Sequence, residues 1–182
     1  MNLRKYQKVY KKFLHTSLAS ELEYKTNILV DLITAILSLI GSIFLLSIFF
    51  QNNGYIGGWK FEQALIIQGI YTILNGITNT WFNPNLTEIV KHIREGTLDF
   101  VLLKPIDSQF FISLKKINPS GFLEIMLGFF LLLICIRINQ INLSLSFLTL
   151  SLITISCSIC ILYSLWFLSL LLLFGLLRLG MQ

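Results

Sequence analysis

Charged residues are scarce in this chain of 182 residues, because Asp, Glu, Lys and Arg make up 13% of it while hydrophobic residues make up 55%. A soluble domain usually has about a quarter of its residues charged, so the composition excludes an ordinary soluble fold and indicates a membrane protein. The three cysteines, Cys135, Cys157 and Cys160, lie within apolar stretches, which argues against an extracellular disulfide framework. The phosphate-binding pattern G-x-x-x-x-G-K-S/T is also absent, so the chain cannot hold a nucleotide by that route.

Groupings of catalytic or metal-binding residues are missing as well. Cys157 and Cys160 form a C-x-x-C without a nearby histidine, and both His15 and His92 lie in basic amphipathic segments. We therefore expect no catalytic site, no metal and no cofactor in this chain. The net charge of +5 is expected to mark cytoplasmic loops and not a nucleic-acid partner.

Long apolar segments predict an all-α fold, a polytopic transmembrane helix bundle that forms one domain over residues 1–182. The predicted spans cover residues 28–50, 64–82, 119–138 and 143–174. The first would extend about 34 Å, enough for a hydrocarbon core of about 30 Å. The last has no glycine or proline to make a turn, so one long helix is favoured over two.

The first 24 residues predict an amphipathic helix with an aromatic-rich stripe and a basic face, which suits a helix lying in the membrane interface. The alternative is a basic leader that is simply solvated. Lys and Arg number six before the first span, one after it, five after the second span and one after the third. This alternation predicts an inner or plasma membrane protein with a cytoplasmic N-terminus.

Residues 85–107 therefore form a cytoplasmic loop. Asn85 followed by Glu88 has the spacing of a capping box, and Asn83-Pro84-Asn85 is predicted to end the second span. A short helix should then run from Leu86 to about Glu95, where Gly96 would stop it. Its apolar residues recur at i, i+3, i+4 and i+7, and they are Leu86, Ile89, Val90 and Ile93.

An apolar run follows this helix, from Phe100 to Leu103, and Pro105 closes it. Such a run is unfavourable in water, so it should lie on the membrane, on the chain's own helices or on a partner protein. From the pattern alone, an interfacial helix that touches lipid and a helix that binds a protein groove are about equally favoured.

The stretch IREGTLDFVLLKP, residues 93–105, resembles the first cytoplasmic loop of type-2 ABC transporter permeases, the membrane subunits of ABC exporters. The matching positions are Ile93, Arg94, Gly96, Leu98, Asp99, Leu102 and Pro105. The resemblance implies that this loop is a coupling element which sits on an ATP-binding subunit, with Leu86–Glu95 in a groove and with Arg94 and Glu95 at its rim. It also implies a homo- or heterodimer with a second permease subunit, and ATP hydrolysis on the partner only.

The number of spans departs from that family, whose members usually carry about six. Four are predicted here, and the chain stops soon after the fourth. We therefore expect a shortened or truncated member that lacks two spans.

Polar and acidic residues lie inside the predicted spans, where they can pack helices together or take part in function. Gln68, Thr72, Asn75 and Asn79 share one face of the second span, which predicts either helix packing or the polar lining of a substrate path. Asp31 and Glu124 are acidic residues at membrane depth, and Lys25 is close enough in sequence to pair with Asp31.

Two alternatives to a permease remain open. One is a structural or assembly protein of the membrane, without transport activity, that holds lipid or partners through its basic segments. The other is an intramembrane enzyme that would need Asp31 or Glu124 as its acid–base groups.

Overall fold

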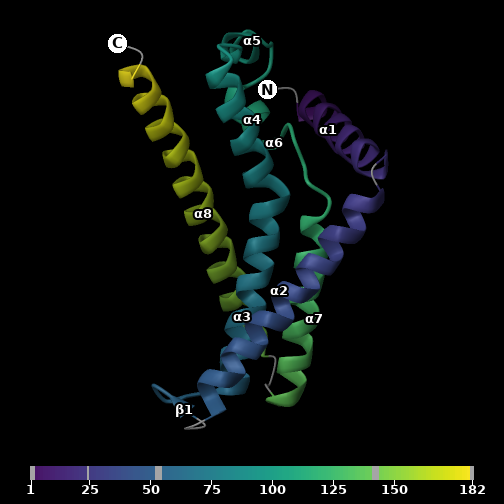
Figure 1. The fold of residues 1–182 in the computed structure, drawn as a ribbon, viewed down its shortest axis with the longest axis vertical. Coiled ribbons are helices and arrows are strands. Elements are labelled where there is room, and N and C mark those ends of the chain that lie inside the picture. Colours follow the sequence, from purple (N-terminus) through teal and green to yellow (C-terminus); the bar gives the residue numbers. More distant parts are fainter. Residues whose placement is uncertain (1–2, 24, 52–54, 141–143, 181–182) are drawn as a thin grey trace. The chain divides into compact units, whose positions relative to one another are not determined.

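The computed structural model describes residues 3–23, 25–51, 55–140 and 144–180 (Figure 1). The all-α prediction is confirmed, because nearly all described residues are helical and only one short hairpin of strands accompanies them. The chain divides into two compact units. Unit 1 comprises Met1–Ala19, Thr78–Asn118 and Leu145–Gln182, and unit 2 comprises Ser20–Ile77 and Pro119–Ser144.

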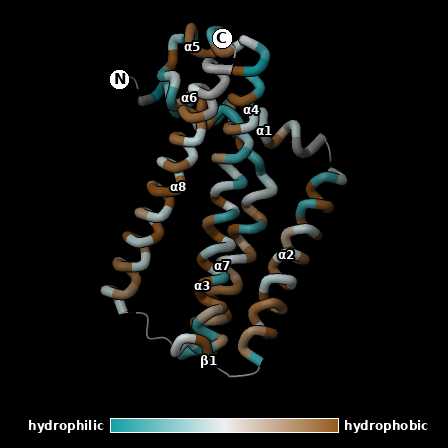
Figure 2. The backbone as a smooth tube through the Cα atoms, turned by 60° about the vertical axis from the view of Figure 1, so that its left-hand side comes forward, coloured by the Kyte–Doolittle hydropathy of each residue, from teal (hydrophilic) through white to brown (hydrophobic). Residues whose placement is uncertain are grey.

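Unit 2 contains three helices: α2 (Lys25–Gln51), α3 (Phe61–Ile77) and α7 (Gly121–Ile138). The two helices α3 and α7 lie side by side (Figure 2), and α2 contacts both. Glycines make the α3–α7 contact close. A Cβ atom on Gly76 would lie 2.8 Å from the carbonyl oxygen of Gly121, and one on Gly128 would lie 2.8 Å from that of Gly69. This is the small-residue packing expected between helices in lipid.

A hairpin connects α2 to α3 through β1 (Tyr55–Ile56) and β2 (Trp59–Lys60). The strands are antiparallel, with Ile56 opposite Trp59. Gly57 and Gly58 form the two-residue turn with φ of 58° and 86°, values that suit glycine and match the tight turn of a two-residue hairpin.

Unit 1 contains most of α1 (Leu3–Glu23), the π-helical turn η1 (Thr78–Phe82) and three short helices. The short helices are α4 (Asn83–Arg94), α5 (Leu98–Leu102) and α6 (Ser108–Leu114). The last element of unit 1 is α8 (Leu145–Gly180), one helix of 36 residues, as favoured by the sequence.

Three described helices are long and apolar enough to cross a membrane, over Thr26–Gln51, Gly121–Ile138 and Leu145–Leu172. The predicted span 64–82 is not one α-helix, because α3 ends at Ile77 and η1 follows it directly.

The predicted start of a separate helix after Asn85 is wrong, whereas the end of the membrane span at Asn83-Pro84-Asn85 stays a prediction. Because α4 begins at Asn83, directly after η1, Pro84 lies in its first turn, where a proline costs no hydrogen bond. The capping box is also wrong, since no side chain caps α4 and Asn85 lies inside the helix. By contrast, the stop at Gly96 is confirmed by its φ of 66°, and the N–H of Thr97 donates to the carbonyl of His92 to close the helix end.

Candidate functional site

The apolar face of α4 packs inside unit 1. Ile89 is 6% exposed and belongs to a buried cluster with Phe82, Trp166 and Leu170, the last two from α8. Leu86 and Ile93 pack against the same cluster and are partly buried, while Val90 is half-buried. The stripe predicted to dock in a partner's groove therefore faces the chain's own α8, and little of Ile89 remains exposed to a partner. Its role in partner binding stays a prediction.

Aromatic side chains bind α8 to the rest of this cluster. The ring of Tyr163 lies 5.7 Å from that of Phe82 and 5.9 Å from that of Trp166, measured between centroids. The hydroxyl of Tyr163 accepts a hydrogen bond from Gln109 Nε2 at 2.9 Å and lies 3.0 Å from Ser113 Oγ. Tyr163 thus joins α8 to α6 by its polar end and to η1 by its ring.

Apolar side chains remain exposed on α5. Phe100, Leu102 and Leu103, here called the α5 patch, are 72%, 50% and 80% exposed. Val101 between them is buried, and it lines with Leu98 a cavity of only about 10 Å³ against α4 and α6. Val101 and Leu98 therefore hold α5 to unit 1, while Phe100 and Leu102 of the helix and Leu103 directly after it remain exposed. Exposed apolar residues of this kind are typical of surfaces that touch a membrane or another protein.

The predicted coupling residues Arg94, Glu95, Asp99 and Pro105 are exposed and lie close to the α5 patch in sequence. Lys91 and Glu95 approach to 3.9 Å at the exposed end of α4, and Arg94 is exposed beside them. Asp99 is also exposed. Pro105 is exposed, and its carbonyl accepts a hydrogen bond from Lys5 Nζ at 2.7 Å. A charged rim next to an apolar patch is a common composition for a protein interface.

The aromatic stripe of α1 packs on α6. Tyr6 meets Phe110 edge to face at 4.9 Å between centroids, and Phe13 meets Phe111 at 5.6 Å. The basic residues of the other face are exposed; they are Arg4, Lys5, Lys8, Lys11 and Lys12. Part of the stripe expected to touch lipid is thus in contact with protein, and the interfacial position of α1 stays a prediction.

The side chain of Asn85 makes four hydrogen bonds, and the residue is 1% exposed. Its Nδ2 donates to the carbonyls of Trp81 at 2.6 Å, Ser113 at 3.0 Å and Lys116 at 2.7 Å. Its Oδ1 accepts from the N–H of Lys116 at 2.9 Å. The amide has two hydrogens for three carbonyls, so one hydrogen is shared. Asn85 therefore ties α4 to the end of α6.

Glu88, one turn further along α4, is surrounded by positive charge. Its Oε1 lies 2.7 Å from Lys115 Nζ and 3.6 Å from His92 Nε2, and its Oε2 lies 3.7 Å from Lys116 Nζ. The hydrogen bond from Lys115 is the main reason that the pKa of Glu88 lies below its usual value of 4.5, and burial opposes it only in part. The ion pair thus joins the same two elements as Asn85.

The polar residues of α3 reach different partners. Gln68 Nε2 donates to Ser42 Oγ of α2 at 2.9 Å, and Asn75 Nδ2 donates to Glu124 Oε2 of α7 at 2.9 Å. Thr72 donates to the carbonyl of Gln68 in its own helix. The first two bonds are contacts between helices, as the packing interpretation predicts. Whether this face lines a substrate path stays a prediction.

Asn79, which was predicted at this face, and Asp31, which was predicted as an acidic residue of the first span, lie on other elements. Asn79 belongs to η1, and its Oδ1 accepts from Asn83 Nδ2 at 2.6 Å. Asp31 is half-buried in α2, while the side chain of Lys25, its predicted partner, lies outside the described residues. Within residues 3–23, 25–51, 55–140 and 144–180, no three His, Cys, Asp or Glu side chains come together as a metal site requires.

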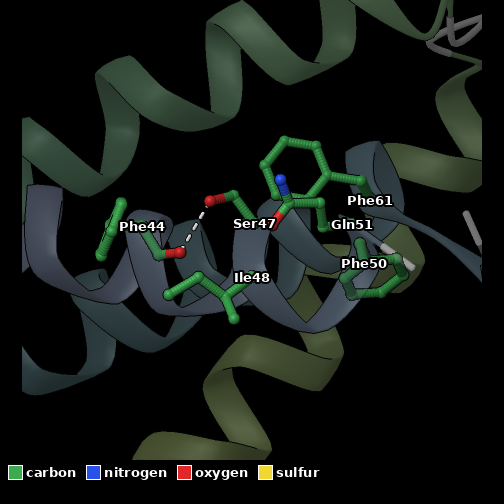
Figure 3. A pocket seen from close by; sticks show the side chains of 6 residues that line it. All are labelled: Phe44, Ser47, Ile48, Phe50, Gln51 and Phe61. Atoms are coloured by element: carbon green, nitrogen blue, oxygen red, sulfur yellow. Dashed lines mark hydrogen bonds between the residues drawn. The ribbon is translucent and has the colours of Figure 1, made fainter. Parts of the chain in front are cut away.

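An open pocket of about 430 Å³ lies in unit 2 at the end of α2 (Figure 3). Its lining is mostly aromatic and aliphatic and consists of Phe44, Ser47, Ile48, Phe50, Gln51 and Phe61. The Ser47 hydroxyl is engaged, since it donates to the carbonyl of Phe44 at 2.7 Å (Figure 3). Its size is within the range of small-molecule sites, but it is wide open.

The sequence patterns predicted neither α6 nor the non-helical segment Lys115–Asn118 that follows it. Asp107 begins α6 and caps it, since Oδ1 accepts from the N–H of Phe110 at 2.8 Å. An aspartate before a run of helix-compatible residues is a usual start signal, and it could have been read at this position. Nothing in the sequence near Asn85 indicates its partners, which lie about 30 positions further along the chain.

Comparison with models of known protein families gave a match over most of the chain. A family model described as "ABC-2 family transporter protein" matches residues 36–180. Searches of curated proteins and of solved structures found no significant match.

Proposed function

We propose that a separate ATP-binding subunit binds the α5 patch of this chain, which belongs to the ABC-2 family of transporter proteins, and thereby drives its movement. Membership in the family makes the chain a membrane transport component, a permease of an ABC transporter, and not itself a catalyst. Family membership and the lack of a phosphate-binding pattern in this sequence support an energy source on another subunit.

The exposed α5 patch is the observation that carries this proposal. Burying three large apolar side chains would stabilise a complex by several kcal/mol, at about 25 cal/mol per Å² of apolar surface. The charged residues Lys91, Arg94 and Glu95 would form the rim of the contact. The contact surface is therefore shifted from the stripe of α4, which packs on α8, to the α5 patch.

Orientation and assembly follow from charge and exposure. The alternation of Lys and Arg favours a cytoplasmic α4–α6 segment, on the side of the membrane where ATP is available, in an inner or plasma membrane. The apolar side chains of α2 are exposed along its length, including Leu37 and Phe44, and lipid or a second permease subunit would cover them. Export as the direction of transport rests on the resemblance of residues 93–105 to exporter permeases.

The test is co-purification: the chain is expressed together with its neighbouring genes, and the purified material is searched for an ATP-binding subunit with a phosphate-binding loop. We expect the unmodified chain to retain that subunit, and Leu103→Asp to weaken the complex about tenfold, as loss of a central apolar contact does. Thr87→Asp is the matched control, because Thr87 is also exposed but lies on α4 outside the patch.

The outcomes separate two errors. If no ATP-binding subunit ever co-purifies with the unmodified chain, the proposed function is wrong and a structural role in the membrane is favoured. If the subunit co-purifies and Leu103→Asp retains it as well as Thr87→Asp does, the function stands but the α5 patch is not the contact.

A further inference from the structure

A short non-helical segment, Lys115–Asn118, follows α6 and is here called the strap. Three successive backbone N–H groups of the strap have partners on three different elements. Lys116 N donates to Asn85 Oδ1 of α4 at 2.9 Å, and Ile117 N donates to Ser17 Oγ of α1 at 3.2 Å. The third, Asn118 N, donates to the carbonyl of Thr80 in η1 at 2.9 Å.

These bonds are needed because the strap is buried without secondary structure of its own. Ile117 is 3% exposed, and both Ser17 and Thr80 are buried as well. A buried N–H without a partner is costly, so each of the three contacts fixes the place of the strap as well as satisfying a donor. Asn85 contributes most, because it binds both the N–H and the carbonyl of Lys116.

The strap is also the chain connection from the α4–α6 segment to α7. Asn118 is followed by Pro119, and α7 begins at Gly121. We propose that Asn85 is a positioning residue that fixes the strap to α4, while Ser17 fixes the strap to α1, so that a displacement of α4 reaches α7 through the strap. This proposal rests on the proposed function, since the ATP-binding subunit would supply the displacement.

The first experiment measures whether Asn85 holds the strap. Spin labels are placed on Lys91→Cys in α4 and Lys116→Cys in the strap, both exposed, in the full chain with Cys135→Ala, Cys157→Ser and Cys160→Ser. Pulsed electron–electron double resonance then gives the distribution of distances between the two labels. We expect Asn85→Ala to broaden it about twofold, because the strap would sample open states.

Two variants accompany this measurement. Thr87→Ala is the control, because its hydroxyl bonds only to its own helix, at the carbonyl of Asn83, and its distribution should match that of the parent. If Asn85→Ala does not fold, Ser17→Ala takes its place, since it removes a single bond to the strap, and it should still broaden the distribution. A folded Asn85→Ala protein, or failing that Ser17→Ala, with the distribution of the parent would overturn the proposal.

The second experiment measures transmission, with labels on Lys91→Cys and on Phe122→Cys at the start of α7. In the complex with the ATP-binding subunit, trapping with ATP and vanadate should shift the distance between these labels. In Asn85→Ala the shift should be lost while the complex still forms and hydrolyses ATP, which a merely destabilised protein would not do. A full shift in Asn85→Ala, or none in the parent complex, would refute transmission through the strap.

If the proposed function is wrong, the outcome differs from the results of both spin-label experiments. In that case no ATP-binding subunit binds, whereas the first experiment still decides whether Asn85 fixes the strap.

Discussion

The α3–α7 pair and the α4–α6 pair each hold two chain segments close together, by opposite means. Between α3 and α7 the contact depends on missing side chains, because Gly76 and Gly128 let backbones approach. Between α4 and α6 it depends on one added side chain, because Asn85 fills the space and satisfies backbone groups from both segments. The α3–α7 contact thus consists of closely packed backbone, and the α4–α6 contact depends on the buried side-chain amide of Asn85.

The difference reflects what each pair can gain from its surroundings. Helices in lipid gain nothing from burying apolar side chains, so close backbone packing must hold them together. The α4–α6 segment includes non-helical chain whose polar groups need partners, so a side chain with donors and an acceptor is the effective link. Substitutions should therefore act in opposite directions: adding atoms harms the first contact, and removing them harms the second.

The largest effect is expected from Gly76→Leu. Its Cβ would lie 2.8 Å from both the carbonyl oxygen of Gly121 and the N–H nitrogen of Ile125, and neither backbone atom can move without shifting α7. We expect the variant to lose about 3 kcal/mol or more of unfolding free energy, at the upper end of overpacking costs. Thermal unfolding in detergent, followed by tryptophan fluorescence, measures it.

Gly41→Leu is the control for this change, because a Cβ on Gly41 meets nothing within 4 Å in α2. It should unfold within a few degrees of the parent. Equal losses in both variants would show that leucine is harmful at either glycine, and the α3–α7 contact would not be special.

A smaller effect is expected from Glu88→Gln in the α4–α6 pair. The ion pair with Lys115 is partly exposed, so we expect a loss of about 1 kcal/mol at neutral pH. Because the pKa of Glu88 is lower in the folded protein than its usual 4.5, the stabilisation is present above pH 4.5 and is lost as the pH falls through the folded value. The gap in unfolding temperature between parent and variant should therefore close below pH 4.5.

Glu95→Gln provides the comparison, since Glu95 is about half exposed and lies 3.9 Å from Lys91. Exposed pairs contribute little, so this variant should match the parent at neutral pH. A gap for Glu88→Gln that does not change between pH 7 and pH 3 would contradict the role of its charge.

Local patterns in the sequence predicted the parts of the fold that depend on neighbours along the chain. Apolar run lengths predicted an all-α membrane protein, and the absence of glycine and proline predicted α8 as one helix. The stop at Gly96 was predicted because a left-handed residue ends a helix wherever its neighbours lie. The family motif at residues 93–105 predicted the transporter class that the family match shows.

Contacts between distant positions could not be predicted in this way. The apolar stripe containing Ile89 was evident, but its periodicity does not distinguish a partner's groove from α8, more than 70 positions away. Asn85 was interpreted as a helix cap because Asn favours caps, whereas its bonds are to residues near the end of α6. Helical spacing gives the face of a helix, and only the tertiary structure gives what covers that face.

The smallest effect, and the sharpest test of the comparison, concerns the hydrogen bond from Gln68 to Ser42 between α3 and α2. If contacts in unit 2 rest on backbone packing, this polar contact should add little. A double-mutant cycle of Gln68→Leu and Ser42→Ala, measured by unfolding in detergent micelles, should give a coupling energy of about 0.6 kcal/mol, the average for such bonds between membrane helices. Ser47→Ala is the control partner, because Ser47 donates within its own helix and should show no coupling to Gln68. A coupling as large as the loss in Gly76→Leu would mean that side-chain amides hold both units, and the distinction between the two pairs would fail.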